Sequence, residues 1–386
     1  MITVISKLSG SFYVKVAKPL LFKMSADDVH EGLINLGVFV QKIPLLCWLM
    51  RWAWCYDDDI LKTEVVGVKF SNPVGMSAGF DKDCKVISML KMVGFGFVEC
   101  GSVTRHSYAG NQKPWYTRLP KTKSIVVNAG LKSQGAESVA ARLSAYKRRQ
   151  ICGMPINVSV AKTNSFDTVD IAKGVQDYCE TLKIIKSTGR ADMYTLNISC
   201  PNAFGGEPFT TPETLQKLLK SVDKLKLDKP IFVKMPIDKT WPEFEQLLDV
   251  ASNHNVQGIT IGNLRKDRRK AKIKDDFKPD TPGNLSGKPC WQPSNELLAK
   301  SYKKYSDRFV FVGVGGIFTA QDAYQKIKLG ASLVEMITGV IFNGPSTAGI
   351  INKDLAELLK KDGYQNVSQA VGADIIKEKA NEKARV

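Results

Sequence analysis

Short apolar, β-branched segments alternate with longer segments of helical periodicity along most of the chain. Eight of the short segments are predicted to be strands: NPVGMSAG (72–79), FGFVECGS (95–102), INVSVA (156–161), YTLNIS (194–199), IFVKMP (231–236), GITIGN (258–263), FVFVGVGG (309–316) and LVEMITG (333–339). Continuous apolar runs of this length are typical of parallel strands that are buried on both faces.

The segments between the strands have the spacing of amphipathic helices. In TPETLQKLLKSVDKL (211–225), Thr211 is a candidate N-cap and the leucines form one stripe, while Gly330 ends the pattern of 319–330. Eight strand-then-helix units predict an α/β fold, a closed (β/α)8 TIM barrel. An open doubly wound sheet is the alternative, but the count of eight and the absence of an early G-x-G-x-x-G turn favour the barrel.

Residues 1–60 precede the first strand and are predicted to add a two-helix extension. Ser25 is a candidate N-cap of the first helix, and the second is rich in Trp and Leu. Polar residues interrupt the apolar run 32–56, so it lacks the ~18 uninterrupted apolar residues expected of a membrane-spanning helix. The extension either packs on the side of the barrel or forms a flap that inserts into a membrane surface, with Lys42 and Arg51 facing the head groups.

Three regions are therefore expected. They are a helical extension over 1–60, the barrel over 61–365, and a polar, basic C-terminal tail over 366–386 that is frayed or a solvated helix.

The net charge of +17 and the cysteine pattern bear on whether the protein binds nucleic acid or a metal ion. The charge favours an anionic partner or serves only solubility. The densest basic segment, KDRRKAKIKDDFK (266–278), lacks interleaved aromatic residues, so we expect a solvated loop and no nucleic-acid partner. Eight cysteines without a C-x-x-C motif and three scattered histidines predict reduced thiols and no metal site.

Amide side chains and one thiol stand at or just beyond predicted strand ends. The amides belong to Asn128, Asn197, Asn202 and Asn263, and Cys200 lies among them in NISCPN. Each asparagine alone is typical of a turn, and most cysteines are inert. If the side chains converge, they would bind a flat heterocycle with alternating C=O and N–H groups, and a Cys200 thiolate could remove a proton from carbon.

Two lysines and two glycine turns indicate a phosphorylated cofactor. Lys82 follows the first strand and Lys234 lies inside the apolar fifth strand, where it requires an anion or a cavity unless it snorkels. The turn GVGG (313–316) and Thr338-Gly339 follow the last two strands, where barrels commonly bind phosphate. A flavin fits, because a cation near its N1/O2 edge stabilises the anionic reduced form.

The chain resembles the dihydroorotate dehydrogenases, FMN enzymes of pyrimidine synthesis. The resemblance runs from about residue 13 to about 345 and rests on NPVGMSAGFDKD, GFGFVECGSVT, GNQKPWYTRL, NISCPN, VKMP, LSGKP, GVGGI and TGVIFNGP. The N-terminal helices and the surroundings of His30 and Arg118 are similar to the membrane-associated class, in which the extension guides quinone to FMN. This implies a quinone partner and a peripheral location on a membrane surface, the cytoplasmic face in a bacterium.

The resemblance implies a role for each matching position. Cys200 would be the base that takes the C5 proton of dihydroorotate as hydride leaves C6 for the flavin, and His30 and Arg118 would lie at the quinone site. The substrate would contact Lys82, Asn128, Ala129, Gly130, Leu131, Asn197, Asn202 and Asn263. FMN would contact Ala78, Gly79, Lys82, Ser102, Asn128, Asn157, Asn197, Lys234, Gly262, Gly287, Gly315, Gly316, Thr338 and Gly339.

The chain departs from the family pattern at four places. Cys200 stands where the quinone class usually has serine, as in the soluble class that reduces fumarate or NAD. Leu264 replaces a small hydroxyl residue, NAGLKSQG (128–135) is shortened, and Ile337 replaces an aromatic residue. The alternatives are therefore a soluble acceptor such as fumarate, another pyrimidine-like substrate, or a non-catalytic membrane- or RNA-binding barrel. The sequence does not indicate an oligomeric state.

Overall fold

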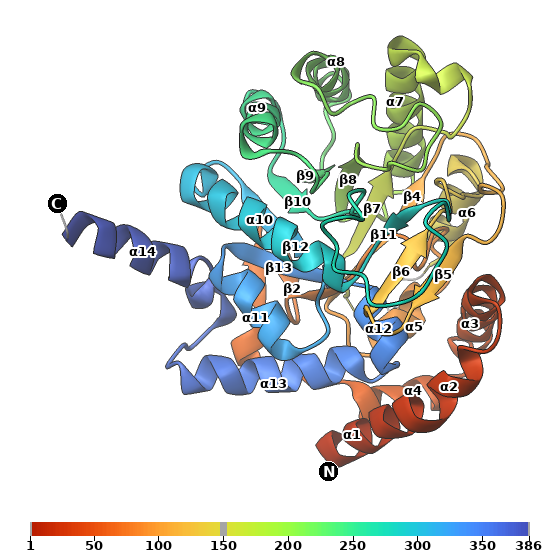
Figure 1. Cartoon of the computed structure of the whole chain (residues 1–386), viewed down its shortest axis with the longest axis vertical. Coiled ribbons are helices and arrows are strands. Elements are labelled where there is room, and N and C mark those ends of the chain that lie inside the picture. Colours follow the sequence, from red (N-terminus) through yellow and green to blue (C-terminus); the bar gives the residue numbers. More distant parts are fainter. Residues whose placement is uncertain (1, 147–152, 385–386) are drawn as a thin grey trace.

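Eight parallel strands close into a barrel in the computed structural model, which describes residues 2–146 and 153–384 (Figure 1). Around the barrel they are β3 (Val74–Met76), β4 (Phe97–Val103), β7 (Ile156–Val160), β8 (Met193–Asn197), β9 (Ile231–Met235), β10 (Gly258–Ile261), β12 (Val310–Val314) and β13 (Ala331–Met336). Pairing of β13 with β3 completes the closure. All eight predicted strands and the TIM barrel are confirmed.

Helices surround the barrel, as the periodicity predicts. They are α5 (Ile87–Met92), α6 (Ala136–Ala145), α7 (Ile171–Ser187), α8 (Pro212–Asp223), α9 (Trp241–Ser252), α10 (Trp291–Tyr305), α11 (Ala320–Lys328) and α13 (Thr347–Lys361), with the short α12 (Thr338–Asn343) after β13. Thr211 caps α8, because its side chain accepts a hydrogen bond from the Thr214 amide.

The interior of the barrel contains two layers of side chains. The lower layer, toward the amino ends of the strands, is apolar, and the layer above it is polar. Phe97, Met193, Phe232 and Leu333 fill the lower layer, which the hairpin of β1 (Thr63–Val65) and β2 (Val68–Phe70) covers from outside. Two residues further along the same strands lie Glu99, Thr195, Lys234 and Glu335, all buried. Since side chains two apart on a strand share a face, the polar layer faces the same interior.

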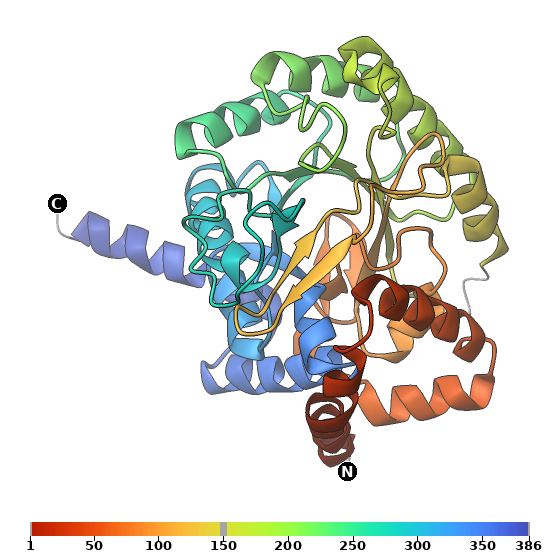
Figure 2. The same cartoon turned by 45° about the vertical axis from the view of Figure 1, so that its right-hand side comes forward.

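A small antiparallel sheet lies over the carboxyl ends of the barrel strands. It consists of β5 (Tyr116–Leu119), β6 (Ser124–Val127) and β11 (Asn284–Leu285), and β5 and β6 cross in front of the barrel in Figure 2. The basic segment 266–278 packs Ala271, Ile273 and Phe277 against this sheet. Asp275 also accepts hydrogen bonds from the Thr122 amide and hydroxyl. The segment is therefore anchored more firmly than the solvated loop expected from its charge.

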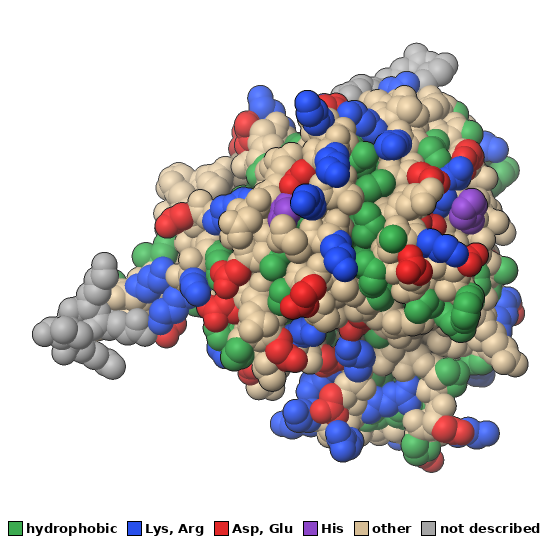
Figure 3. All heavy atoms as spheres, turned by 90° about the horizontal axis from the view of Figure 1, so that it is seen from above, with side chains coloured by type: hydrophobic (Ala, Val, Ile, Leu, Met, Phe, Trp, Pro, Cys, Tyr) green, Lys and Arg blue, Asp and Glu red, His purple; other side chains and the backbone are tan. Residues whose placement is uncertain are grey.

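The surface charge is dispersed. On the face shown in Figure 3, basic side chains are interspersed with acidic ones. Within the basic segment, Lys266 pairs with Glu207 at 2.5 Å, and Lys270 pairs with Asp267 at 3.6 Å.

The N-terminal extension contains more helix than the sequence pattern predicts. The two expected helices are α3 (Ala26–Val40), with Ser25 as N-cap, and α4 (Pro44–Trp54). They follow an almost continuous helix of α1 (Ile2–Phe12), a π-helical turn (Tyr13–Ala17) and α2 (Lys18–Leu21). These N-terminal helices lie together at one side of the barrel, near α13 (Figures 1 and 2).

Among the described helices, none alone has the length and apolar character needed to cross a membrane. The pair α3 and α4 reaches that length and composition only together, with a bend of 113° between them.

The C-terminal region begins packed and ends projecting. Val367 and Ala370 are buried, whereas α14 (Ala373–Ala384) extends away from the barrel in Figure 1. Of the polar tail expected from the sequence, Arg385 and Val386 lie outside the described residues.

Asp27 fastens α3 to the sheet over the barrel mouth. Its buried carboxylate accepts hydrogen bonds from the backbone amides of Trp115, at 3.0 and 3.1 Å, and Tyr116, at 3.0 Å. Charge-assisted hydrogen bonds of this kind are stronger than neutral ones. Glu31 adds an ion pair with Lys132 at 2.6 Å, a further polar attachment of the helix besides its apolar packing.

We predict that Asp27→Ala lowers the free energy of unfolding by about 2 kcal/mol, because it removes hydrogen bonds to a buried charged group. Urea unfolding measures the loss, and hydrogen exchange of the Trp115 and Tyr116 amides should accelerate. Asp28→Ala is the matched control, since Asp28 is the exposed neighbour. Equal stability of the two variants would contradict the attachment.

Candidate active site

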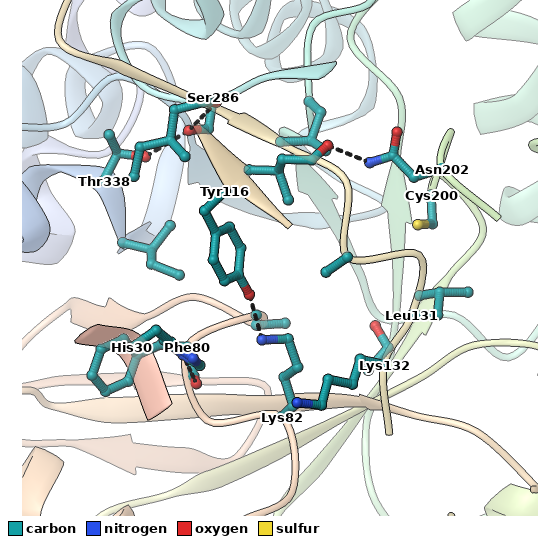
Figure 4. Close-up of a pocket in the computed structure, with 18 of the residues that line it drawn as sticks. His30, Phe80, Lys82, Tyr116, Leu131, Lys132, Cys200, Asn202, Ser286 and Thr338 are labelled. Carbon is teal, nitrogen blue, oxygen red and sulfur yellow. Dashed lines mark hydrogen bonds between the residues drawn. The ribbon is translucent and has the colours of Figure 1, made fainter. Parts of the chain in front are cut away.

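A cavity of about 200 Å³ opens at the carboxyl ends of the barrel strands (Figure 4). Its inner end is polar and is formed by Lys82, Asn197, Cys200, Asn202 and Asn263. Its outer end is apolar and is formed by Ala26, Val29 and Leu33 of α3 together with Ile125, Val127, Ile337 and Ile341. The cavity can thus hold a polar ring at one end and a lipophilic group at the other.

Two predicted asparagines, Asn197 and Asn263, form a connected amide network at the polar end. Asn197 donates to the Ser102 hydroxyl at 2.8 Å. Asn263 donates to Ser199 at 2.7 Å and to the Asn197 side-chain oxygen at 3.3 Å. Side chains fixed in this way hold their remaining donors and acceptors in place for a ligand.

Asn202 belongs to the same wall but is held from the covering sheet. Its side chain donates to the Val127 carbonyl at 2.8 Å and accepts from Asn284 at 2.7 Å. The loop after β8 is thereby fastened to β6 and β11, which places Cys200 and Asn202 on the same side of the cavity in Figure 4.

Most of the predicted contact residues line this cavity. Ala129, Gly130 and Leu131 do so beside the amides, and the substituted positions Leu264 and Ile337 also face the space. Asn128 and Asn157 are outside its lining: Asn128 accepts a hydrogen bond from Asn111, and Asn157 exchanges hydrogen bonds with Thr195.

Cys200 occupies the loop directly after β8 and lines the cavity. Burial raises the pKa of its thiol to about 11, which outweighs the opposing effect of the Asn202 amide. The thiol is therefore protonated at neutral pH, and it becomes a stronger base when it loses that proton than a thiol of ordinary pKa. Cys152 lies outside the described residues.

Lys82 is linked to His30 through Tyr116. The Lys82 ammonium donates to the Tyr116 hydroxyl at 2.5 Å, and the Tyr116 ring lies 5.5 Å from the His30 ring. Burial, with Lys82 nearby, lowers the pKa of His30 to about 3. His30 is thus a neutral imidazole that bonds the Phe80 carbonyl at 2.9 Å.

Arg118 joins the barrel to the N-terminal segment. Its guanidinium donates to the Met24 carbonyl at 2.8 Å and lies 4.7 Å from the centre of the Phe22 ring, and burial lowers its pKa. Both predicted quinone-site residues therefore lie on the cavity wall, next to α3.

A second cavity of about 90 Å³ adjoins the first and shares Ala78, Lys234, Asn263 and Thr338 with it. Gly262, Gly287, Gly315, Gly316 and Gly339 line it. Gly315 and Gly316 have φ of +99° and +75°, and a Cβ on either would lie within 3 Å of Cys290 or Trp291, so glycine is required there. The hydroxyls of Ser286 and Thr338 lie 2.9 Å apart at the same place.

These residues fit a flavin mononucleotide. Hydroxyl groups and glycine backbone suit a phosphate, and the ammonium of Lys234 borders both cavities, where it can face an electron-rich ring edge. Two buried carboxyl groups lie close to this ammonium, Glu99 at 3.0 Å and Glu335 at 3.7 Å.

Some residues of the site were not found from the sequence. Tyr116 lies in a predicted segment, GNQKPWYTRL, but its bond to Lys82 depends on how the covering sheet folds over the barrel. Glu99 and Glu335 lie in predicted strands, and their spacing along the strands would have placed them inside the barrel with Lys234.

Comparisons with known proteins agree on one family. The family model described as Dihydroorotate dehydrogenase matches residues 60–359. A relative from Haloarcula marismortui named Dihydroorotate dehydrogenase (quinone) is 33% identical over 360 residues, which cover 93% of this chain and 99% of the relative. One of the same name from Trichodesmium erythraeum is 30% identical over 380 residues, covering 94% and 98%.

A solved structure has the same overall shape. The crystal structure of DHODH from Eimeria tenella in complex with ferulenol superposes with a TM-score of 0.82 at 26% identity, covering 91% of this chain and 96% of that chain.

Proposed function

The chain belongs to the dihydroorotate dehydrogenase family, and we propose that it oxidises dihydroorotate to orotate in pyrimidine biosynthesis and passes the electrons to a quinone. The observation that carries this proposal is the meeting of the Cys200 thiol, three fixed amides and Lys82 in one cavity that adjoins a glycine-lined pocket.

The cofactor is FMN, held by Ala78, Gly79, Ser102, Lys234, Gly262, Gly287, Gly315, Gly316, Thr338 and Gly339, which line the two cavities or their junction. When bound, FMN accepts the two electrons that leave the substrate. Asn128 and Asn157 act from behind this wall, through Asn111 and Thr195.

Cys200 is the base of the reaction. Oxidation of dihydroorotate removes a proton from C5 and a hydride from C6, the adjacent carbon. The Cys200 thiolate takes the proton from C5. Asn197, Asn202 and Asn263 hold the C=O and N–H groups of the ring, and Ala129 to Leu131 cover it. The Lys82 ammonium, supported by Tyr116, attracts the substrate carboxylate.

The apolar end of the cavity supports quinone as the acceptor. Val29, Leu33 and Ile341 give this end apolar walls, against which a lipophilic ring is desolvated at lower cost than a fumarate dianion. Arg118 is partly buried and can donate to a quinone oxygen in this otherwise apolar space. The neutral His30 donates its one N–H to the Phe80 carbonyl and presents its other ring nitrogen as an acceptor. We assign residues 1–60 to this acceptor site, 61–365 to the FMN barrel, and 366–386 to a peripheral tail.

A peripheral membrane location would bring lipid-soluble quinone to this end. Along α1 and α2, Val4, Leu8, Phe12, Val16 and Leu20 are exposed at intervals of four residues, so they form one apolar stripe. On α4, Leu45, Trp48, Leu49 and Trp52 are also exposed. Lys7 and Lys15 are exposed in the same helical segment, where they can meet anionic head groups.

We predict that Cys200→Ala slows reduction of the flavin by dihydroorotate about 10²- to 10⁴-fold without weakening binding of the substrate, because the base is lost. Stopped-flow absorbance under anaerobic conditions measures the rate. In the parent protein the rate should rise about tenfold per pH unit between pH 7 and 9, since the pKa of Cys200 is about 11.

The matched control for this variant is Cys179→Ala, a partly buried thiol on α7 outside the cavity. Reduction of Cys200→Ala at the parent rate would refute the assignment of the base. A purified protein that is colourless and unable to bind FMN would refute the enzyme itself.

We predict that a short-chain ubiquinone reoxidises the reduced enzyme faster than fumarate does. Leu33→Asp should raise the KM for quinone about tenfold or more while flavin reduction is retained, because it places a charge in the apolar end. Leu36→Asp is the control, because Leu36 is an exposed residue of the same helix that does not line the cavity. Faster reoxidation by fumarate would identify a soluble acceptor.

We predict that the triple variant Leu8→Ser, Phe12→Ser and Leu20→Ser binds vesicles of phosphatidylcholine and phosphatidylglycerol at least about a hundredfold more weakly, since it removes three exposed apolar side chains that would insert into the bilayer. Sedimentation with vesicles measures binding. Phe166→Ser with Ile376→Ser removes equally exposed apolar groups elsewhere. Equal losses in both variants would contradict the stripe.

A further inference from the structure

We propose that Glu335 is held as a neutral carboxylic acid that shares its proton with Glu99, and that it acts as a positioning residue for Lys234 beneath the flavin site. The proposal rests on the assignment of this site to FMN. It concerns a residue to which the reaction itself assigns no role.

The three side chains form one enclosed cluster. Lys234 Nζ lies 3.0 Å from Glu99 Oε2, 3.7 Å from Glu335 Oε2 and 3.3 Å from the Ser77 hydroxyl. Each of the three charged residues is at least 95% buried. The cluster therefore has no bulk water with which to balance its charges.

The charges in the cluster do not balance if every group is ionised. Glu99 comes from β4, Lys234 from β9 and Glu335 from β13, so two carboxylates face one ammonium. At the level of Glu335, the neighbouring strands provide Val314 and Gly75, which do not ionise. The layer below is apolar, so among the described residues Lys234 and Glu99 are the charged groups that face Glu335.

The hydrogen bonds of the cluster independently indicate that one of the two carboxyl groups carries a proton. Glu99 Oε1 and both side-chain oxygens of Glu335 are buried and accept no hydrogen bond from the described residues. A buried carboxylate without donors is costly, whereas a proton on Glu335 turns one oxygen into a donor and Glu99 into its acceptor. One proton thus satisfies two of these three oxygens, one on each carboxyl group, and leaves one anion for Lys234.

The pKa values of the pair diverge accordingly. Burial and the neighbouring Glu99 raise the pKa of Glu335 well above its usual value. Burial opposes ionisation of Glu99 too, but the charge of Lys234 outweighs it and lowers the pKa of Glu99. Two carboxyl groups that compete for one cation in this way divide into an acid and an anion.

The cluster borders the cofactor pocket. Lys234 and Glu335 both line the 90 Å³ cavity, and Lys234 also lines the larger one. An ionised Glu335 would make the cluster negative and oppose the arrival of electrons at the flavin. A neutral Glu335 keeps the cluster balanced, so that the ammonium is available to an electron-rich ring edge.

Glu335→Gln tests the assignment, because an amide has the shape of the neutral acid but cannot ionise. We expect the parent protein with FMN bound to show the infrared carbonyl band of a protonated carboxylic acid, shifted in D2O, and the variant to lack that band. The midpoint potential of FMN at pH 7 should be the same in both. Thr260→Val, in the same buried layer, should keep the band.

An ionised Glu335 predicts the opposite result: no such band in the parent protein, and a higher midpoint potential in Glu335→Gln because a negative charge is removed. Either finding would overturn the proposal. If Glu335→Gln does not fold, Glu335→Asp serves instead, and its band should move in frequency. A protein that shows the band but does not oxidise dihydroorotate would refute the proposed function and leave this assignment standing.

Discussion

The ion pair between Lys234 and Glu99 inside the barrel is the interaction on which the site depends. A lysine can remain charged there only because the barrel is closed, the layer below is apolar, and a carboxylate lies 3.0 Å from its ammonium. The ammonium in turn gives the pocket above it a positive end. Closure of the barrel therefore keeps a positive charge at the pocket, and the apolar layer below excludes water from that charge.

Above this layer, the side chains of the site come from two parts of the fold. The strand ends supply the groups that handle a polar ring, which are Cys200, Lys82 and the amides. The N-terminal helix α3 and the covering sheet supply an apolar chamber at the other end. A barrel alone has only the first of these, so in the proposed function it is the extension that supplies the site of the lipophilic acceptor.

Much of this arrangement could be predicted from the sequence, because the eight strands are short apolar runs and barrels place chemistry at the ends of such strands. Cys200, Asn197 and Lys234 were located in this way. The remainder depends on contacts between distant segments. Asn128 follows a strand of the covering sheet and not of the barrel, so it lies behind the wall, and the Lys82–Tyr116 bond forms only when that sheet folds over the mouth. The helix over 2–21 contains Gly10 and Pro19, which weaken its local signal.

The attachment of α3 by Asp27 has a consequence for the passage of molecules. The buried Asp27 carboxylate and the Glu31–Lys132 pair restrict movement of this helix. The helix therefore forms a fixed side of the cavity and does not open it. The width of the channel is then set by the atoms of Val29 and Leu33 and not by how far a segment swings. In the proposed function, such a passage would act as a size filter, which would select acceptors by the width of their rings.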